Sequence, residues 1–226
     1  MNKALISYLA SFFTPSKLEN IEKVLSHRTK YLTVVIEDIY HSQNASAVVR
    51  SCDCFGIQNV YFLENKNKFQ TNPHVSMGAS KWVNIKRFAS TPMNNASSTC
   101  ITDLKAQGYR IVATSPHDKQ STADSIPLDK PLAVFFGNEK EGLSDFVMKN
   151  ADAHLYIPMY GFTESLNISV SAAMIMKTLY ERIVKETTNW SLTEDDKNEL
   201  RLEWFSKSLR NSDYIIADYF KSKTNT

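Results

Sequence analysis

The sequence is poor in glycine, in paired cysteines and in long apolar runs. Its 226 residues include only six glycines, which excludes collagen-like and linker-rich chains. The three cysteines show none of the CxxC spacings of zinc or thioredoxin-like sites, so we expect buried thiols in a reducing compartment. No apolar run approaches the ~18 residues that cross a bilayer, and the first residues lack the small-x-small cleavage site of a signal peptide. We therefore expect a cytoplasmic protein without a membrane partner.

The charges of the chain nearly cancel. It carries 26 Lys and Arg residues against 24 Asp and Glu residues, a net charge of +2 at pH 7. This balance is too small to indicate a nucleic-acid-binding protein, so any basic surface must come from local clustering. Hydrophobic residues at 42% and charged residues at 22% are typical of a globular chain and exclude global disorder.

Several catalytic motifs are also missing. The chain has neither the GxGxxG motif of dinucleotide-binding folds nor the GxxxxGK[ST] motif of P-loop nucleotide triphosphatases. It has no GxSxG nucleophile elbow, and its five histidines show no HExxH or HxH spacing. We therefore expect neither a Rossmann dehydrogenase nor an α/β-type serine hydrolase, and no bound metal.

What is present is an alternation of strands and helices. Apolar, β-branched segments predict strands at residues 31–37, 60–63, 109–113, 132–136 and 154–157. Helical spacing of apolar side chains predicts helices at residues 44–55, 98–107, 143–149 and 167–185. This alternation predicts an α/β fold with a mostly parallel sheet and helices on both faces.

Both ends of the chain have a helical pattern. The N-terminal end predicts two helices separated by Pro15, because proline cannot continue the first of them. The C-terminal end predicts further helices, with Ser191 or Thr193 as an N-cap. We thus predict an N-terminal helical extension at 1–30, an α/β core at 31–185 and a C-terminal helical extension at 186–226.

Ligands of a parallel α/β sheet bind at the carboxyl ends of its strands, and three polar loops follow such ends. In the first loop, residues 41–50, Asn44 is suited to be the N-cap of the following helix. Arg50 lies among apolar neighbours in the sequence, so it needs a partner or a polar cleft. A buried structural salt bridge and a functional role are equally good explanations of Arg50.

The second loop, residues 137–142, places Asn138 and Glu139 directly after an apolar strand. Two glycines, Gly137 and Gly142, bracket these polar residues. A plain turn explains the glycines, but it does not explain an amide and a carboxylate at the carboxyl end of a strand.

The third loop, residues 157–167, is rich in Met, Tyr and Phe and ends at the start of a long helix. Ser165 or Asn167 is suited to be the N-cap of that helix, and both together favour a pocket for a ligand that is part apolar and part polar. The three loops offer an Arg, a Glu, two Asn and a Ser, with no paired carboxylates and no activated nucleophile. The chemistry that fits is direct transfer of a group from a bound donor, with catalysis by positioning and electrostatics.

The three loops resemble the motifs of SpoU/TrmH-type RNA ribose methyltransferases of the SPOUT superfamily, over about residues 31–185. The matching segments are Asn44-x-x-Ala47-x-x-Arg50, Gly137-Asn138-Glu139-x-x-Gly142, and Ile157-Pro158-Met159 with Ser165-Leu166-Asn167-x-Ser169-x-Ser171. The resemblance implies that the C-terminal part of the core is threaded into a trefoil knot, one of the rare exceptions to unknotted topology. It also implies a homodimer and S-adenosylmethionine as the methyl donor.

The resemblance further implies roles for individual residues. The family's cofactor loops correspond to Thr114, Gly137, Ile157, Pro158, Met159, Ser165, Leu166 and Asn167. Its catalytic residues correspond to Arg50, Asn44, Glu139, Ser165 and Asn167. The implied reaction is attack of a ribose 2′-hydroxyl on the sulfonium methyl group. Because a guanidinium, with a pKa above ~12, scarcely deprotonates in proteins, we expect Arg50 to orient the ribose or a phosphate and to stabilise the developing oxyanion.

The terminal extensions bear on which RNA is the substrate. Ribosomal-RNA members often carry a separate RNA-binding domain, for which thirty residues are too few, whereas short helical extensions resemble the tRNA-modifying branch. That branch methylates a D-loop guanosine, guanosine 18. We expect RNA contacts from Arg50, Lys66, Lys68, Lys81, Lys86 and Arg87, although a solvated charged loop equally explains the cations of residues 60–90. A ribosomal-RNA 2′-O-methyltransferase and a catalytically silent RNA-binding scaffold are the alternatives.

Overall fold

The structure is a computed structural model that describes residues 2–68 and 73–224. Its contacts divide the chain into two compact units. The core unit runs from Thr29 to Trp190, and the terminal unit combines the residues up to Arg28 with those from Ser191 on. The predicted boundaries after residues 30 and 185 stay predictions, because contact density does not establish which segments fold independently.

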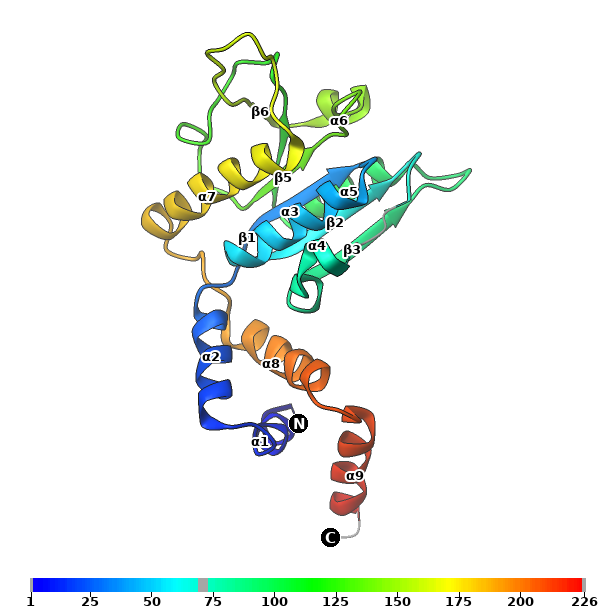
Figure 1. The fold of residues 1–226 in the computed structure, drawn as a ribbon, viewed down its shortest axis with the longest axis vertical. Coiled ribbons are helices and arrows are strands. Elements are labelled where there is room, and N and C mark those ends of the chain that lie inside the picture. Colours follow the sequence, from blue (N-terminus) through cyan, green and yellow to red (C-terminus); the bar gives the residue numbers. More distant parts are fainter. Residues whose placement is uncertain (1, 69–72, 225–226) are drawn as a thin grey trace. The chain divides into compact units, whose positions relative to one another are not determined.

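The core unit is built on a six-stranded sheet in which neighbouring strands are parallel (Figure 1). In the order in which they lie side by side, the strands are β3 (Asn84–Ala89), β2 (Ile57–Glu64), β1 (Thr29–Glu37), β5 (Leu132–Phe136), β4 (Arg110–Thr114) and β6 (Ala153–Leu155). At the centre, Val34 of β1 pairs with Val60 of β2 and with Val134 of β5. The predicted α/β fold with a parallel sheet is confirmed.

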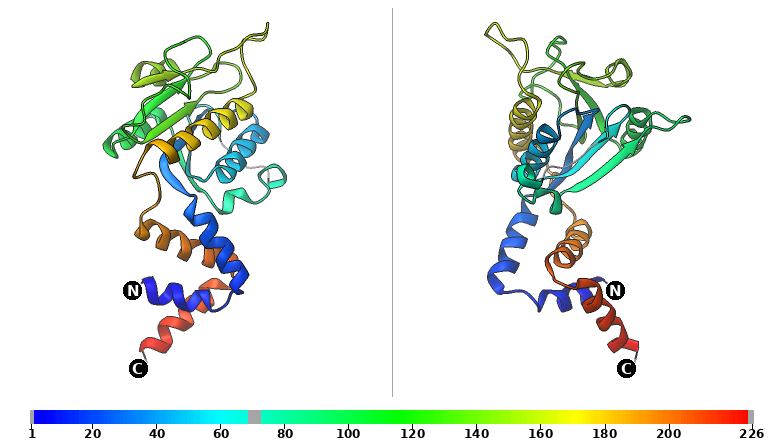
Figure 2. Two further views of the ribbon diagram at one scale, coloured as in Figure 1. Left: turned by 90° about the vertical axis from the view of Figure 1, so that its left-hand side faces the viewer. Right: turned by 45° about the vertical axis from the view of Figure 1, so that its right-hand side comes forward.

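Helices cover both faces of this sheet, because successive strand residues point to opposite sides (Figure 2). Val34 faces the layer that contains α3 (Ser42–Cys54) and α7 (Ile168–Glu186). Val35 faces the layer that contains α5 (Ala96–Ala106) and α6 (Asp145–Asn150). The short helices α4 (Pro73–Ser76) and η1 (Ala79–Lys81) pack beside α3.

The predicted strands and helices of the core are present, with ends shifted by up to three residues. One strand, β3, was not predicted from the sequence; it lies at the edge of the sheet, where it pairs with β2. Lys86 and Arg87 are adjacent and both exposed, so β3 lacks the apolar alternation by which half-buried strands are detected. An edge strand tolerates such charges because one of its sides is open to solvent.

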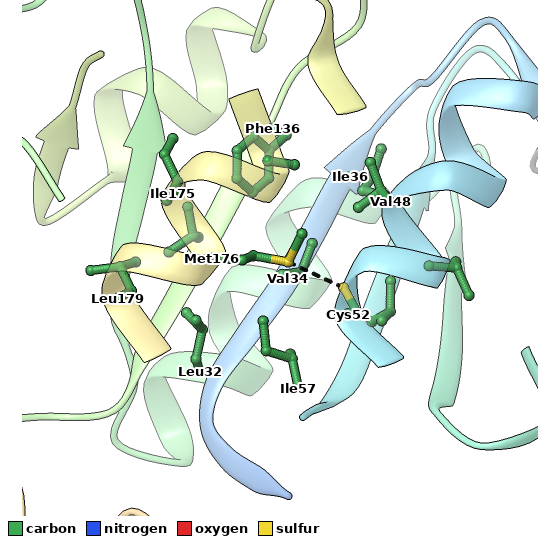
Figure 3. Close-up of a cluster of buried hydrophobic side chains, with 14 of the residues drawn as sticks. Leu32, Val34, Ile36, Val48, Cys52, Ile57, Phe136, Ile175, Met176 and Leu179 are labelled. Carbon is green, nitrogen blue, oxygen red and sulfur yellow. Dashed lines mark hydrogen bonds between the residues drawn. The ribbon is translucent and has the colours of Figure 1, made fainter. Parts of the chain in front are cut away.

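The larger apolar layer is shown in Figure 3. Leu32 and Ile36 of β1 lie between side chains of α3 and α7, and Cys52 of α3 contacts Met176 of α7 through sulfur atoms 3.4 Å apart. Cys52 and Cys100 are buried free thiols, as predicted. The prediction fails for Cys54, which is exposed because it lies on the outer side of α3.

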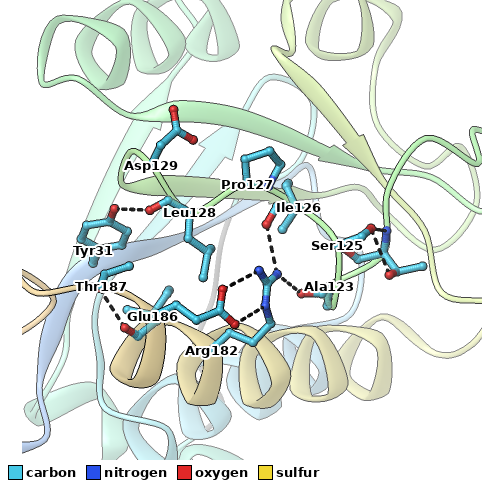
Figure 4. A network of polar contacts seen from close by, with 12 residues as sticks. Tyr31, Ala123, Ser125, Ile126, Pro127, Leu128, Asp129, Arg182, Glu186 and Thr187 are labelled. Atoms are coloured by element: carbon cyan, nitrogen blue, oxygen red, sulfur yellow. Dashed lines mark hydrogen bonds and ion pairs between the residues drawn. The ribbon is translucent and has the colours of Figure 1, made fainter.

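The long connection between β4 and β5, residues 115–131, packs against two later elements. Ser121 lies beside the end of β6, where its carbonyl oxygen accepts a hydrogen bond of 2.9 Å from the Tyr156 N–H. Arg182 of α7 donates from Nη1 to the carbonyl oxygens of Ala123 and Ile126, at 2.7 and 3.0 Å (Figure 4). The connection is therefore held at both the outer edge of the sheet and one face of α7.

The terminal unit joins helices from both ends of the chain: α1 (Asn2–Ala10), α2 (Pro15–Ser26), α8 (Glu194–Ser208) and α9 (Ser212–Thr224). Its buried apolar side chains are Leu5, Ile6, Leu9, Ile21, Leu25, Leu192, Leu200, Trp204, Phe205 and Tyr219. Arg201 of α8 forms two bonds of 2.7 Å with the carboxylate of Glu22 of α2. Segments far apart in the sequence thus stabilise one another.

The local signals at the helix ends of this unit are confirmed. Pro15 is the first residue of α2, and the Thr14 hydroxyl caps that helix by accepting from the Lys17 N–H. Thr193, one of the two predicted candidates, caps α8 in a reciprocal capping box with Asp196. In the described part of the chain, no helix combines the length and apolar content that a membrane span requires.

Candidate functional site

Four strands of the core unit end side by side at the carboxyl edge of the sheet. They end at Glu37 (β1), Phe136 (β5), Thr114 (β4) and Leu155 (β6), and the order β1-β5-β4-β6 makes these ends neighbours. The three predicted ligand loops follow β1, β5 and β6. The parallel topology therefore gathers these loops at one edge.

Three of the predicted catalytic side chains form a continuous hydrogen-bond chain at this edge. Asn44 Nδ2 donates to Glu139 Oε1 at 2.5 Å, and Asn167 Nδ2 donates to Asn44 Oδ1 at 3.2 Å. The backbone N–H of Tyr40 adds a bond of 3.3 Å to Glu139 Oε2. Each predicted loop contributes one member, so the fold brings together side chains that the sequence separates by up to 123 positions.

The prediction that Asn44 caps its helix is wrong. α3 begins at Ser42 and its N-cap is His41, so Asn44 is the third residue of the helix. The amide of Asn44 instead engages Glu139 and Asn167. Helix capping therefore does not explain this asparagine.

Asn167 both caps a helix and belongs to the site. Its Oδ1 accepts from the N–H and the hydroxyl of Ser169, at 2.8 and 2.6 Å, which confirms it as the N-cap of α7. These bonds fix the amide plane and turn Nδ2 toward Asn44. Ser165, the other candidate cap, is exposed and has no hydrogen-bond partner among the described residues.

The Glu139 carboxylate is held in its charged form. Partial burial raises the pKa of Glu139, but the hydrogen bonds from the Asn44 amide and from the backbone N–H groups of Glu139 and Tyr40 outweigh it, so the pKa lies below its ordinary value. A carboxylate has about four acceptor positions, and Asn44, Tyr40 and the backbone N–H of Glu139 itself take three of them. The position that remains is available to a donor such as a hydroxyl group.

The loop that carries Glu139 doubles back on itself tightly. A Cβ atom at Gly137 would lie 2.0 Å from the carbonyl carbon of Gly142, so only glycine fits there. Asn138 Oδ1 accepts from the backbone N–H groups of Lys140 and Glu141, at 2.9 and 2.7 Å. Steric necessity and an Asx turn thus fix the backbone between the two glycines.

Glu37, a buried carboxylate at the end of β1, was not predicted from the sequence. Only 1% of its surface is exposed. Its oxygens accept from the N–H and hydroxyl of Ser144 (2.7 and 2.8 Å), from the hydroxyl of Ser97 (2.6 Å) and from the amide of Asn65 (3.4 Å). Glu37 thereby ties together the starts of α5 and α6 and the segment after β2. The available signal was a charged residue directly after the apolar residues Val34, Val35 and Ile36.

The predicted cofactor loop, residues 157–167, is open to a ligand. The backbone groups of residues 157–166 make no hydrogen bonds to other described residues. Ile157 and Met159 are half-buried, and Leu166 is 37% exposed. Thr114, at the neighbouring strand end, uses its hydroxyl to bond the Phe135 carbonyl at 2.8 Å. Free backbone amides beside apolar side chains suit a ligand with an apolar and a polar part.

Arg50 lies apart from the hydrogen-bond chain. It is exposed and has no hydrogen bond or ion pair to the described residues, so the buried salt bridge considered for it is wrong. Six residues of helix separate it from Asn44, which is ~9 Å along the axis of α3. Arg50 lies at the surface because it is on the outer side of α3, whereas its neighbour Val49 faces the core. Its guanidinium is free to meet an external anion.

The predicted basic patch is partly neutralised. Three of its cations pair with acidic side chains: Lys66 with Glu141 (2.7 Å), Lys86 with Asp103 (2.6 Å) and Arg87 with Glu64 (2.5 Å). Lys81 lies in η1, and Lys68 is exposed. The solvated-loop alternative is wrong for residues 84–89, which form β3. A role of these cations in binding RNA stays a prediction.

Apart from the buried Glu37, the groups available to a ligand in the hydrogen-bond chain and the cofactor loop are amides, the Glu139 carboxylate and open backbone groups. No group of three or more His, Cys, Asp or Glu side chains in residues 2–68 and 73–224 is arranged to hold a metal ion. The Asn44–Glu139–Asn167 chain can orient a hydroxyl group and accept its hydrogen bond. The adjacent loop can hold a donor molecule, so the edge is equipped for group transfer to a hydroxyl.

Comparisons with known proteins agree with this geometry. The model of the SpoU rRNA Methylase family matches residues 31–177. The tRNA (guanosine(18)-2'-O)-methyltransferase of Borreliella burgdorferi is 41% identical over 210 residues, which cover 93% of this chain and 94% of that protein. The enzyme of the same name from Thermus thermophilus is 32% identical over 163 residues, 72% of this chain and 81% of that protein.

Solved structures show the same fold. The Aquifex aeolicus TrmH/SpoU tRNA modifying enzyme matches with a TM-score of 0.75 at 27% identity, over 87% of this chain and 98% of that chain. The SpoU methyltransferase AviRb from Streptomyces viridochromogenes, solved in complex with the cofactor AdoMet, matches with a TM-score of 0.59 at 20% identity. That match covers 73% of this chain and 62% of that chain, and it bears on the fold alone.

Proposed function

The chain belongs to the SpoU rRNA Methylase family, and we propose that it is an S-adenosylmethionine-dependent methyltransferase acting on the ribose 2′-hydroxyl of guanosine 18 in tRNA. The observation that carries this proposal is the hydrogen-bond chain Asn44–Glu139–Asn167, to which all three sequence motifs contribute. The relatives that match over most of the chain carry the name of this activity. A tRNA substrate also makes the cytoplasm the proposed location.

The methyl donor is held by residues at the ends of β4, β5 and β6. Thr114, Gly137 and Ile157 mark these strand ends, and the unpaired backbone groups of residues 157–166 offer donors and acceptors to the polar parts of the molecule. The side chains of Pro158, Met159 and Leu166 offer apolar contact. When bound, S-adenosylmethionine supplies an electrophilic sulfonium methyl group, and S-adenosylhomocysteine leaves after its transfer.

The ribose is oriented by the hydrogen-bond chain. Glu139 is ionised at neutral pH, so its open acceptor position receives the hydrogen bond of the 2′-hydroxyl. Asn44 and Asn167 hold that carboxylate in place, and the exposed hydroxyl of Ser165 lies two residues from Asn167. The hydrogen-bond chain contributes to catalysis mainly by orienting the 2′-hydroxyl, because a fixed near-attack geometry lowers the entropic part of the barrier.

The proposed role of Arg50 is to stabilise the negative charge that develops on the ribose 2′-oxygen. Its guanidinium has no partner among the described residues, so it is available to the ribose or to an adjacent phosphate. Negative charge develops on the 2′-oxygen as its proton moves toward the Glu139 carboxylate that receives its hydrogen bond, and a guanidinium stabilises this charge without giving up a proton of its own. The oxygen then bonds the methyl carbon as the carbon–sulfur bond of the donor breaks. Lys68, Lys81 and the paired cations Lys66, Lys86 and Arg87 supply phosphate contacts around the site.

The C-terminal part of the core forms the proposed trefoil knot. Residues 115–131 contact the outer side of β6 through Ser121 and one face of α7 through Arg182. The segment between β6 and α7 carries the cofactor loop. Passing that segment through the 115–131 connection gives the knot and supports a loop that otherwise has no backbone hydrogen bonds.

The proposed assembly is a homodimer. The cofactor loop and the start of α7 expose large apolar side chains: Tyr160 (96%), Phe162 (108%), Leu166 (37%), Val170 (45%) and Met174 (48%). A cluster of this kind marks an interface, because monomers rarely leave contiguous apolar surface in water. Light scattering after gel filtration would give twice the mass of 25.7 kDa, and Met174→Glu would shift it toward the monomer.

The activity is tested with radiolabelled S-adenosylmethionine. Purified protein is incubated with unmodified tRNA transcripts and, separately, with ribosomal-RNA fragments, and the position of any 2′-O-methyl group is mapped. The proposal predicts label at guanosine 18 of tRNA and its loss in Arg50→Ala. Arg50→Lys distinguishes charge from fork geometry, and near-normal turnover of this variant would refute the orienting role of the guanidinium.

The other outcomes point to the alternatives. Label on ribosomal RNA alone would support the proposed reaction but show that its substrate is ribosomal RNA instead of tRNA. Binding of S-adenosylmethionine without transfer to either RNA would indicate a different acceptor. Absence of donor binding would favour a silent RNA-binding scaffold.

A further inference from the structure

A small depression lies next to the hydrogen-bond chain, and apart from the phosphate contact proposed for Lys68 its side chains have no role in the reaction described above. It is lined by Ile39, Tyr40 and Ser42, which follow β1, and by Asn67 and Lys68, which follow β2. β1 and β2 are neighbours in the sheet, so these two segments meet at its carboxyl edge. Because the backbone N–H of its lining residue Tyr40 bonds Glu139, the depression adjoins the proposed ribose site.

Tyr40 presents an aromatic ring to solvent at this place. Tyr40 is 58% exposed, although it directly follows the buried residue Ile39. The ring is held rather than loose: Lys140 Nζ lies 4.7 Å from its centroid, and the His41 ring packs edge-on at 5.0 Å. The backbone N–H of Tyr40 bonds Glu139. A fixed, exposed aromatic ring is a stacking platform for a nucleobase.

Asn67 presents a fixed acceptor in the same depression. Its backbone N–H bonds Asp38 Oδ1 at 3.2 Å, and its Nδ2 bonds the Asp38 carbonyl oxygen at 3.0 Å. Asp38 also accepts from the N–H groups of Asn65 and Lys66, so the whole segment is anchored. With Nδ2 engaged, Asn67 Oδ1 has no donor among the described residues. It is therefore open to the N–H groups of a purine.

Covalent geometry keeps the base within one sugar ring of the 2′-hydroxyl, which brings this depression within its reach. The 2′-hydroxyl is on the ribose carbon adjacent to the one that carries the base. If the hydroxyl lies at Glu139, the base lies one sugar ring away, and Tyr40, whose backbone N–H bonds Glu139, lines the depression beside it. Guanine has donors at N1 and N2 that an amide oxygen accepts, whereas adenine has an unprotonated acceptor at N1.

From this arrangement we infer that the depression binds the guanine base of the target nucleotide, with Tyr40 as the stacking platform and Asn67 as an acceptor for its N–H groups. The inference rests on the proposed function and names the base-binding part of the same site. Stacking positions the base, and through it the 2′-hydroxyl. Tyr40 and Asn67 are therefore positioning and specificity-determining residues.

The first test measures methyl transfer by variants of the full chain. Base stacking on an aromatic side chain predicts that Tyr40→Ala lowers kcat/KM for tRNA by about 5- to 100-fold. Tyr40→Phe, which keeps the ring, stays within about 2-fold. Tyr214→Ala, a matched change at a tyrosine that is 73% exposed in the terminal unit, leaves the rate unchanged. Affinity for S-adenosylmethionine is equal in all of them, because the depression lies outside the cofactor loop.

The second test compares tRNA transcripts with guanosine or adenosine at position 18. Wild type prefers guanosine, and Asn67→Ala reduces the preference by about 5-fold or more because the acceptor for N1–H and N2–H is lost. Thermal unfolding of Asn67→Ala checks that the anchored segment is intact. Equal rates of Tyr40→Ala and wild type, or an unchanged base preference in Asn67→Ala, would overturn the inference.

A crosslinking experiment separates this inference from the proposed function. A tRNA with 6-thioguanosine at position 18 is bound to wild type and irradiated, and the crosslinked peptide is identified by mass spectrometry. A crosslink to the segment around Tyr40 or Asn67 supports the depression whether or not methyl transfer occurs. A crosslink elsewhere in a protein that methylates guanosine 18 would overturn the inference and leave the proposed function standing.

Discussion

The buried carboxylate of Glu37 gives a prediction whose size follows from its contacts. Four donor groups converge on two oxygens that are almost fully removed from water. A hydrogen bond to a charged acceptor contributes ~1.5–3 kcal/mol when its loss leaves a buried group unsatisfied. The hydroxyls of Ser97 and Ser144 can rotate toward other acceptors, but the backbone N–H of Ser144 cannot. Glu37→Ala should therefore lower the free energy of unfolding by about 3–5 kcal/mol, less than the sum of the four bonds.

Glu37→Gln separates charge from shape. The three side-chain donors converge on Oε1, which the amide oxygen can replace, while the Ser144 N–H meets Oε2, where the glutamine would present its own NH2 donor. The bond from the Ser144 N–H is lost, and this N–H faces the NH2 group of the glutamine, so the expected loss in the free energy of unfolding is about 1–3 kcal/mol. Glu181→Gln is the control, because the Glu181 side chain is 62% exposed in a surface pair and should cost less than ~0.5 kcal/mol.

The assay is urea unfolding of the full-length variants, followed by circular dichroism and analysed with a common slope. The order expected is wild type and Glu181→Gln together, then Glu37→Gln, then Glu37→Ala. If Glu37→Ala unfolded within ~0.5 kcal/mol of wild type, the view that this carboxylate organises the carboxyl edge of the sheet would be refuted.

Three further predictions concern the loops and thiols. Gly137→Ala should abolish methyl transfer while the protein still folds, because the added Cβ would force the 137–142 loop open; activity near wild type would contradict the tight turn. Since hydrogen bonds hold the pKa of Glu139 below its ordinary value, its contribution to stability is full above the unfolded pKa of ~4.3 and falls as the pH drops through the folded pKa. The unfolding difference between wild type and Glu139→Gln should therefore shrink from pH 7 to pH 3, and so should the contribution of Asn44; a constant difference would refute this. Burial raises the pKa of the Cys100 thiol well above its ordinary range, so a thiol reagent at pH 8 should label Cys54 first, and mass spectrometry showing equal labelling of both would be inconsistent with the fold.

Local patterns in the sequence predicted most of the fold. Strands such as 132–136 are continuous apolar runs because they are buried on both faces of a parallel sheet, and helices such as α7 show apolar side chains at helical spacing. β3 escaped prediction because its position at the edge leaves Lys86 and Arg87 in water. The six-residue sequence of β3 contains no pattern that distinguishes an edge strand of this kind from a charged loop.

The candidate site was predictable in its members but not in its connections. The motif resemblance indicated Asn44, Glu139 and Asn167, and parallel topology indicated that their loops meet. Which side chain bonds which depends on contacts across more than ninety residues, which no local signal contains. For this reason helix capping appeared, from the sequence alone, to be a sufficient explanation for the presence of Asn44.

Arg50 illustrates the reverse error. Its neighbours in the sequence are apolar, which made a buried partner as good an explanation as a functional role, but successive residues of a helix point about 100° apart and so can face core and solvent in turn. Val49 faces the core, whereas Arg50 is exposed. Neighbours along a helix therefore say little about the surroundings of a side chain unless the buried face is known.

The central claim is that the acceptor is the 2′-hydroxyl of the ribose at position 18. The most direct measurement compares transfer of labelled methyl groups to two tRNAs that differ only in guanosine or 2′-deoxyguanosine at that position. We predict that the tRNA with guanosine is labelled at position 18. The tRNA with 2′-deoxyguanosine should bind but carry no label at that position. Equal labelling of the two would contradict this prediction, because the methyl group would then be on the base or on another nucleotide.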